Sequence, residues 1–293
     1  MKKSLLAVLF LVFIRIFSQD IPAQNQGLVK DPFFNNQNPQ EQSGKKVQHK
    51  HSDTFGVSPD KYDGNPVFSG NVVFEQQGSV LTANEVVWYQ KENFLKAIGN
   101  VVLTSADGSR ITAAEMEYDG NTQRGIARKN VVLTDPKQTI KTETLYYDKI
   151  PNTAYFKTGG TIYSNDGSVM YTKSATYNLN SKMIDFVGRS NIETDKYTIV
   201  SDNIKQNQNT GVSDFFGPTT IRDKKNPINY VYTEQGSYNS KTGESFLNKN
   251  SRIHNNGKIL TGDKLYFNRN TGFGKGTGNV MLDDPREKRY IKG

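Results

Sequence analysis

A unit of about 30 residues recurs along this chain, and it constrains the fold more than any other feature of the sequence. In each unit an apolar β-branched residue follows a short segment that is rich in Gly, Asn or other polar residues. The residues at this position are Val72, Val101, Val131, Ile162, Ile192, Ile221, Ile253 and Val280. Their nearly constant spacing predicts a repeat protein, in which each unit packs mainly on its two neighbours.

The stretch 99–120, GNVVLTSADGSRITAAEMEYDG, shows what one unit contains. It begins with a short alternating strand and a turn at 106–109, whose Asp and Gly favour a hairpin. A second run then places large side chains at Ile111 and at five and seven residues beyond it. That spacing consists of two alternating halves with one extra residue between them, which a β-bulge produces. Bulged strands are expected at about 111–118, 140–147 and 260–267.

A third short strand, such as 95–98, is expected to close each unit. The sequence therefore predicts an all-β protein, an elongated open jelly roll or solenoid of about eight repeats of antiparallel strands. Hydrophobic residues make up only 34% of the chain, which suits a thin architecture better than a thick globular core. The absence of Cys excludes disulfides and thiolate zinc sites. The net charge of +8 is compatible with an anionic partner and equally with none.

Three regions follow one another along the chain. Residues 1–18 carry two Lys, a short apolar run and a final Ser, which is typical of a secretory signal peptide and predicts export. Residues 19–44 are rich in Gln, Asn and Pro, and we expect a flexible tether that is dispensable for folding. Residues 45–293 form the repeat domain. Its last unit breaks off at Gly293, which indicates either a fragment or an open sheet edge that pairs with another chain.

No arrangement of residues in the sequence indicates catalysis. The Asp residues recur at turns, where they bond the local backbone, and no pair of carboxylates stands out as a general acid and base. His49 and His51 share one face of a strand, but no third ligand is nearby, so no metal site is expected. Another row consists of Asn71, Asn100, Asn130, Asn191 and Asn279, each placed just before an apolar strand residue. We interpret this row as a structural ladder rather than a ligand site.

Apolar residues that alternate along the strands are expected to line the interior of the array. They are Val101, Leu103, Ile111, Met116, Tyr118, Val131, Leu133, Ile140, Leu145 and Tyr147. If the two apolar sheet faces splay apart, they leave an elongated groove that could bind acyl chains, with Lys and Arg at its mouth for phosphate. A narrow solenoid that these side chains merely fill explains the pattern equally well.

The repeats also resemble those of a known family. The segments Gly70-Asn71-Val72, Gly99-Asn100-Val101, Lys129-Asn130-Val131, Tyr118-Asp119 and Tyr147-Asp148 follow the pattern of the OstA-like repeats of periplasmic lipopolysaccharide-transport proteins. The resemblance spans about 45–293 and implies an open jelly roll that binds the lipid A acyl chains of lipopolysaccharide. It further implies a periplasmic bridge that joins other transport components, or copies of itself, head to tail. It implies neither an enzyme, nor a cofactor, nor a nucleic-acid partner. The alternative function is an exported structural or adhesive β-solenoid without a lipid groove.

Overall fold

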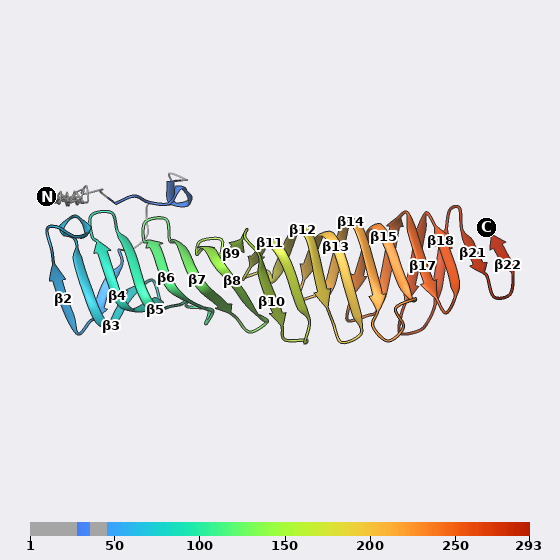
Figure 1. Cartoon of the computed structure of the whole chain (residues 1–293), viewed down its shortest axis with the longest axis horizontal. Coiled ribbons are helices and arrows are strands. Elements are labelled where there is room, and N and C mark those ends of the chain that lie inside the picture. The colour runs from blue at the N-terminus through green and yellow to red at the C-terminus, as the bar shows by residue number, and fades with distance from the viewer. Residues whose placement is uncertain (1–27, 36–45) are drawn as a thin grey trace, which may run out of the picture.

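The computed structural model describes residues 28–35 and 46–293, so the expected signal peptide at 1–18 lies outside the described residues. The described chain forms one elongated antiparallel sheet of 22 strands, with two short 3-10 turns, η1 (Pro32–Asn35) and η3 (Tyr62–Gly64). Figure 1 shows the strands following one another along the long axis in nearly the order of the sequence. The predicted all-β, elongated, antiparallel fold is confirmed.

The strands of the first half are β1 (Gln48–His51), β2 (Thr54–Val57), β3 (Pro66–Gln76), β4 (Ser79–Tyr89), β5 (Phe94–Thr104), β6 (Arg110–Asp119), β7 (Arg124–Thr134), β8 (Gln138–Asp148), β9 (Thr153–Phe156), β10 (Gly160–Ser164) and β11 (Val169–Asn178). Those of the second half are β12 (Met183–Glu193), β13 (Tyr197–Asn207), β14 (Val212–Asp223), β15 (Tyr230–Asn239), β16 (Glu244–Lys249), β17 (Ser251–Asn255), β18 (Lys258–Gly262), β19 (Lys264–Asn268), β20 (Gly274–Thr277), β21 (Met281–Asp284) and β22 (Arg289–Lys292).

Each repeat consists of two long strands rather than the three short ones that the sequence pattern suggested. β5, for example, joins the expected third strand of one unit, 95–98, to the first strand of the next unit. β6 then runs back beside it over its whole length. The short strands merge because the chain bends in the middle of each long strand without leaving the sheet. We call this bend the corner, the half of the sheet with 94–98 wall 1, and the half with 101–104 wall 2.

The corner explains the interrupted alternation, with a correction to its position. Ile98 pairs with Glu115 and Val101 with Ala113, so Gly99 and Asn100 face a single residue of β6. The extra residue of the bulge therefore lies on β5 and not on the strand 111–118, where it was predicted. The φ angles of Gly99 and Asn100 are +76° and +49°, a left-handed conformation that bends the strand. At 260–267 the same irregularity splits the predicted strand into β18 and β19.

Most of the predicted Asn row occupies this left-handed corner position. The members with positive φ are Asn71, Asn100, Asn130 and Asn279. The side-chain amide of Asn279 donates a hydrogen bond at 3.0 Å to Asp263, which lies between β18 and β19, and that of Asn71 donates to Asp53 at the same distance. Asn191 does not belong to the row, because Gly188 takes the left-handed conformation in its strand.

The predicted alignment of the units on their apolar residues is therefore off by two residues, relative to the corner, in part of the chain. Val101 stands two residues after Gly99, but in β12 the residue two places after Gly188 is Ser190, and Ile192 lies further on. Ser190 is 1% exposed and its hydroxyl donates to the Gly188 carbonyl at 3.0 Å. Buried hydroxyls at later corners thus satisfy carbonyl groups that the bulge removes from the ladder.

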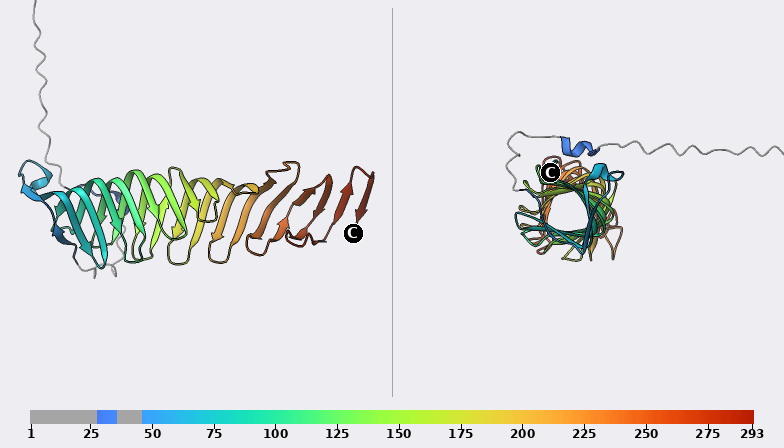
Figure 2. Two further views of the ribbon diagram at one scale, coloured as in Figure 1. Left: turned by 90° about the horizontal axis from the view of Figure 1, so that it is seen from below. Right: turned by 90° about the vertical axis from the view of Figure 1, so that its left-hand side faces the viewer.

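The two walls enclose an apolar core, and Figure 2 shows end-on how the strands curve around one long axis. Opposite the corner, the hairpin turns of wall 1 face those of wall 2, and we call this line of approach the seam. One continuous cluster of buried side chains extends from Val47 to Phe215, and a smaller one is formed around Leu247, Ile253 and Leu265. The buried apolar core is therefore interrupted between Phe215 and Leu247.

Part of the predicted tether is not free of the repeat domain. Residues 28–35, which we call the strap, lie on the outer face of wall 1, where Phe34 is only 1% exposed. Phe34 packs with Val87, Phe94 and Ile126 of the sheet. The expectation of a flexible tether over 19–44 is therefore wrong for 28–35, because an adjacent pair of Phe side chains can bury enough apolar area to hold the segment. The rest of the predicted tether lies outside the described residues.

Candidate functional site

The ten side chains predicted to line the interior all do so. Val101, Leu103, Ile111, Met116, Tyr118, Val131, Leu133, Ile140, Leu145 and Tyr147 are between 0% and 4% exposed and belong to the long buried cluster. In this part of the array the walls pack directly on each other, as in a closed solenoid. A cavity of about 10 Å³ touches Leu103 and Tyr118, which is no more than the space of a single water molecule.

Tyrosines close the seam in this part of the array. The hydroxyl of Tyr118 donates to the side-chain oxygen of Gln76 at 2.6 Å, and Tyr147 lies 3.3 Å from the hydroxyl of Ser105. Tyr177 donates to the carboxylate of Asp135. In each pair the tyrosine comes from a strand end of wall 1 and its partner from a hairpin of wall 2, 42 residues earlier. The rings were predicted to be interior, whereas the contact made by each hydroxyl was missed.

Burial shapes the electrostatics of these pairs. It raises the pKa of Tyr118 far above its usual value, so this hydroxyl remains a donor. Burial also opposes the ionisation of Asp135, but hydrogen bonds from Lys182 and Tyr177 outweigh it and hold the pKa of this carboxyl below its usual range. The Lys182 ammonium lies 2.7 Å from Asp135, so the buried charge is paired. The tyrosine hydroxyls and the Asp135 carboxylate at the closed seam therefore all have polar partners.

The tyrosine row is interrupted in the middle of the array. The row can be followed from strand to strand through paired residues. Tyr177 pairs with Ile184, and Ile184 pairs with Gln206. Gln206 then pairs with Ser213, and Ser213 pairs with Tyr238. Gln206 thus stands where the earlier units carry Tyr, and Ser213 beside it is small. The missing side-chain volume leaves a cavity of about 360 Å³ between the walls. We call 66–193 the closed part of the array and 197–268 the open part. The cavity lies mainly in the open part, and Asp166, Ser168 and Ile192 at the end of the closed part complete its lining.

The cavity has an apolar body and a polar mouth at the seam. Its apolar side chains are Ile192, Ile199, Ile221, Val231, Tyr238 and Phe267. Its polar side chains at the hairpins are Asp166, Ser168, Thr194, Asp195, Ser240 and Arg269. Several apolar members, such as Ile221 and Phe267, are only half-buried, in contrast to the closed part. Such an arrangement can hold an elongated apolar group while a polar group stays at the surface.

Arg269 is the cation at this mouth. Its guanidinium lies 5.5 Å from the centre of the Tyr197 ring and 5.7 Å from that of Tyr238. Burial raises the pKa of Tyr238, and the positive charge of Arg269 opposes this shift. Among the residues that the structure describes, no carboxylate lies within ion-pair distance of Arg269. The guanidinium is therefore placed to meet an anionic group that enters the cavity.

The sequence analysis missed this cavity, although one signal pointed to it. Strands that return along wall 1 end in Tyr118, Tyr147, Tyr177 and Tyr238, and the expected aromatic residue between the last two is absent. The Oε1 atom of Gln206, which replaces it, has no hydrogen-bond donor among the described residues. An irregular member of a regular row thus marks the place where the two walls separate.

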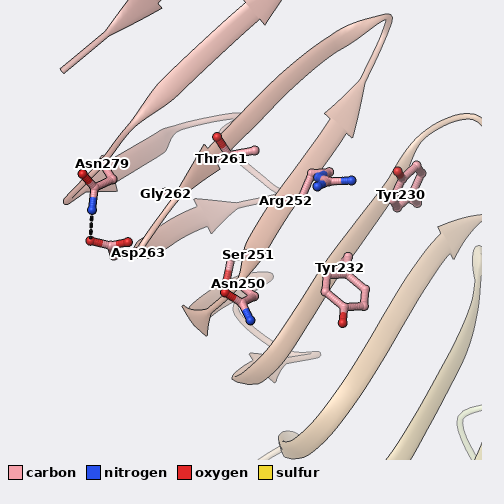
Figure 3. Close-up of a pocket in the computed structure, with 9 residues that line it drawn as sticks. All are labelled: Tyr230, Tyr232, Asn250, Ser251, Arg252, Thr261, Gly262, Asp263 and Asn279. Atoms are coloured by element: carbon pink, nitrogen blue, oxygen red, sulfur yellow. Dashed lines mark hydrogen bonds between the residues drawn. The ribbon is translucent and has the colours of Figure 1, made fainter.

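A second concavity of about 500 Å³ lies on the outer face, and Figure 3 shows its lining. Tyr230, Tyr232 and Arg252 point away from the interior, because they alternate with the inward-facing Val231 and Ile253. Similar hollows lie beside the corner at Thr142 and Ser190. These hollows recur along the corner and are a property of the bent strands rather than a separate site.

The described residues contain no group of three or more His, Cys, Asp or Glu side chains that could share a metal ion. His49 stacks on Phe68, with ring centroids 4.3 Å apart. Within 28–35 and 46–293, no helix is long and apolar enough to cross a bilayer.

Comparison with known proteins identified a matching family and similar solved structures. The family model described as OstA-like protein matches residues 44–202, more than half of the chain. A similar structure is LptH of Pseudomonas aeruginosa, described as the LptA-homologous periplasmic component of the conserved lipopolysaccharide transport device. The sequences are 14% identical, the match covers 48% of this chain and 81% of LptH, and the TM-score is 0.23. A search of curated proteins found no match.

Proposed function

The chain belongs to the family of OstA-like proteins, and from this premise we propose that it carries lipopolysaccharide by holding acyl chains in the cavity of its open part. It would act in the periplasm as one component of a transport bridge towards the outer membrane. The proposed role is binding and transfer, without catalysis. The observation that carries this proposal is the apolar cavity, which opens at the seam next to a cation without a carboxylate partner among the described residues.

The chemistry of the cavity supports an amphiphilic ligand. Ile192, Ile221 and Phe267 offer apolar surface to an acyl chain. Arg269 at the mouth suits a phosphate, because a guanidinium can donate two parallel hydrogen bonds to it. Asp166 and Asp195 at the same mouth would repel a second anionic group nearby, so the site favours a ligand whose anionic group lies next to Arg269.

Lipid contact by the ten predicted interior residues stays a prediction. With exposures of 0% to 4%, these side chains can meet a lipid only if the walls of the closed part separate. Opening would break the hydrogen bonds of Tyr118, Tyr147 and Tyr177 across the seam. The alternative function is an exported structural or adhesive β-solenoid without a lipid groove, and the close packing of 66–193 supports the absence of a groove for this part alone.

The test is to fill the cavity without disturbing the closed part. Ser213 is 7% exposed and lines the cavity, so Ser213→Phe should occupy the space that Gln206 and Ser213 leave open. We expect the variant to lose lipopolysaccharide that co-purifies with the unsubstituted protein, measured by mass spectrometry of extracted lipid. Ser213→Ala is the matched control and should retain it. A folded Ser213→Phe variant with undiminished lipid would overturn the cavity as the site, and an unsubstituted protein free of lipid would overturn the proposed function.

A further inference from the structure

The outer face of wall 1 carries an apolar groove that the interior does not require. Val86 points into the core between the walls, whereas its neighbour Val87 points outward and is nevertheless 0% exposed. Phe94 and Ile126 are also 0% exposed and belong to the same outer cluster. Outward-facing residues of a two-walled sheet normally meet solvent. These side chains are buried because the strap fills the groove.

Aromatic contacts anchor the strap. The Phe34 ring meets the Phe94 ring edge-on at 5.2 Å. The Phe33 ring meets those of Tyr146 and Tyr155 at 5.3 Å and 6.0 Å, also edge-on. Such pairs add to the free energy of apolar burial and fix the orientation of the rings. The groove therefore has a specific place for each of two adjacent aromatic side chains.

Two ion pairs set the direction in which the strap lies. The Lys30 ammonium is 2.8 Å from Asp119, whose side chain is only 3% exposed. Asp31 is 3.3 Å from the Arg128 guanidinium. A segment bound in the opposite direction would bring Lys30 towards Arg128 and leave the carboxylate of Asp119 without its cation. The groove thus recognises a basic residue, an acidic residue and two aromatic residues in this order.

In the described part of the chain, the ion pairs between the strap and the domain are made by side chains. Among the described residues, the backbone hydrogen bond of the strap runs from the Phe34 amide to the Asp31 carbonyl, within the strap itself. Ten residues, 36–45, connect the strap to the repeat domain. A chain of that length can span up to about 35 Å. Recognition of the strap therefore does not depend on its covalent connection to the groove that it occupies.

We propose that the groove also accepts the strap of a second copy of the chain, so that two molecules are joined by exchanging these segments. The exchanged state makes the same contacts, Lys30 with Asp119, Asp31 with Arg128 and the Phe pair with its aromatic pocket, so it needs no new interface. The strap of the same chain has the higher effective concentration, so exchange rises with protein concentration. The groove lies on the outer face, and the inference does not rest on lipid binding in the cavity.

Two full-length variants test the exchange by complementation. The first, Phe33→Ala with Phe34→Ala, keeps the groove but has no functional strap. The second, Arg128→Glu with Tyr146→Lys, keeps the strap but has no functional groove. At a concentration where each variant alone sediments as a monomer, we expect their mixture to contain a species with the summed mass of one copy of each.

A third protein, which carries all four substitutions, is the control. It should not pair with the second variant, because neither partner then has a functional groove. Circular dichroism and melting curves of each variant establish that the repeat domain is folded. A mixture of folded variants that stays monomeric would refute the exchange, and so would a pair that still forms with the fourfold variant.

Discussion

The hydroxyl of Tyr177 donates a hydrogen bond to the carboxylate of Asp135, which lies 42 residues earlier and on the opposite wall. Lys182 donates to the same carboxylate at 2.7 Å, so two donors from wall 1 hold one acceptor of wall 2. This is the most C-terminal of the tyrosine contacts across the seam before Gln206 interrupts the row. The contact therefore stands at the boundary between the closed part and the cavity.

Tyr177→Phe removes this contact and leaves the ring in place. We expect the free energy of unfolding to fall by about 1–3 kcal/mol, because the buried carboxylate of Asp135 loses one of its donors. Urea unfolding followed by circular dichroism measures the change. Tyr171→Phe is the control, since Tyr171 is 48% exposed and its loss of a hydroxyl should leave stability unchanged. Equal stability of the two variants would contradict the role of the seam contact.

Acidification should weaken the same contact. The pKa of Asp135 is below its usual value of 3.8 in the folded protein, because its hydrogen bonds outweigh the effect of burial. A depressed carboxyl pKa stabilises the fold above about pH 4, and this contribution is lost as the pH falls through the folded-state pKa. Urea unfolding at a series of pH values should show this loss. In the Asp135→Asn variant, the part of the acid-induced loss of stability that comes from Asp135 should be absent. A variant whose stability depends on pH as steeply as that of the unsubstituted protein would contradict this contribution of Asp135.

The corner predicts different costs for two Asn residues that look equivalent in the sequence. Asn100 has a φ of +49°, so Asn100→Val places a β-branched residue in a left-handed conformation. This substitution should lower the free energy of unfolding by about 1–2 kcal/mol or more. Asn191 is absent from the positive-φ residues, and Asn191→Val should be nearly neutral in its strand. Thermal melting of both variants tests the difference. If Asn191→Val were the more damaging, the assignment of the corner would be wrong.

A charge placed in the closed part should act differently from one placed in the cavity. Leu145 is 1% exposed in the packed core, so Leu145→Asp buries an unpaired carboxylate and should cost several kcal/mol or prevent folding. Ile221 lines the cavity and is half-buried, so Ile221→Asp should fold while losing bound lipid. Solubility, circular dichroism and lipid content are the measurements. A folded Leu145→Asp variant without lipid would instead assign the lipid to the closed part.

The first sheet edge should contribute to head-to-tail association, which stays a prediction. Among the described residues, β2 pairs only with β3, and its Phe55 and Val57 are 71% and 58% exposed. An uncovered strand with apolar side chains favours the addition of a strand from another chain. Phe55→Lys with Val57→Lys should reduce concentration-dependent light scattering through charge repulsion. Scattering that rises equally steeply in this variant would exclude the edge.

Local patterns were sufficient for the repeat, the β content and the presence of a bulge. Alternation along 101–118 depends only on which side of a strand each residue faces, so it can be read from neighbouring positions. The interior placement of Met116 and Leu145 followed from the same alternation and is confirmed. The extra residue of the bulge was predicted on the wrong strand, at 111–118 instead of on β5. A bulge shifts the pairing register of both strands, so the alternation of one strand does not show which of the two carries the extra residue.

Only the tertiary structure decided where the interior is open, which segment covers the outer face and how the seam is closed. Tyr177 and Asp135 meet across two walls and 42 residues, and Phe34 meets Phe94 across a still longer stretch of chain. The cavity arises because Gln206 occupies the position that Tyr fills in other units, and whether this leaves a space depends on the side chains of the opposite wall. Local periodicity determines the faces of a strand, whereas packing between distant strands determines which faces meet.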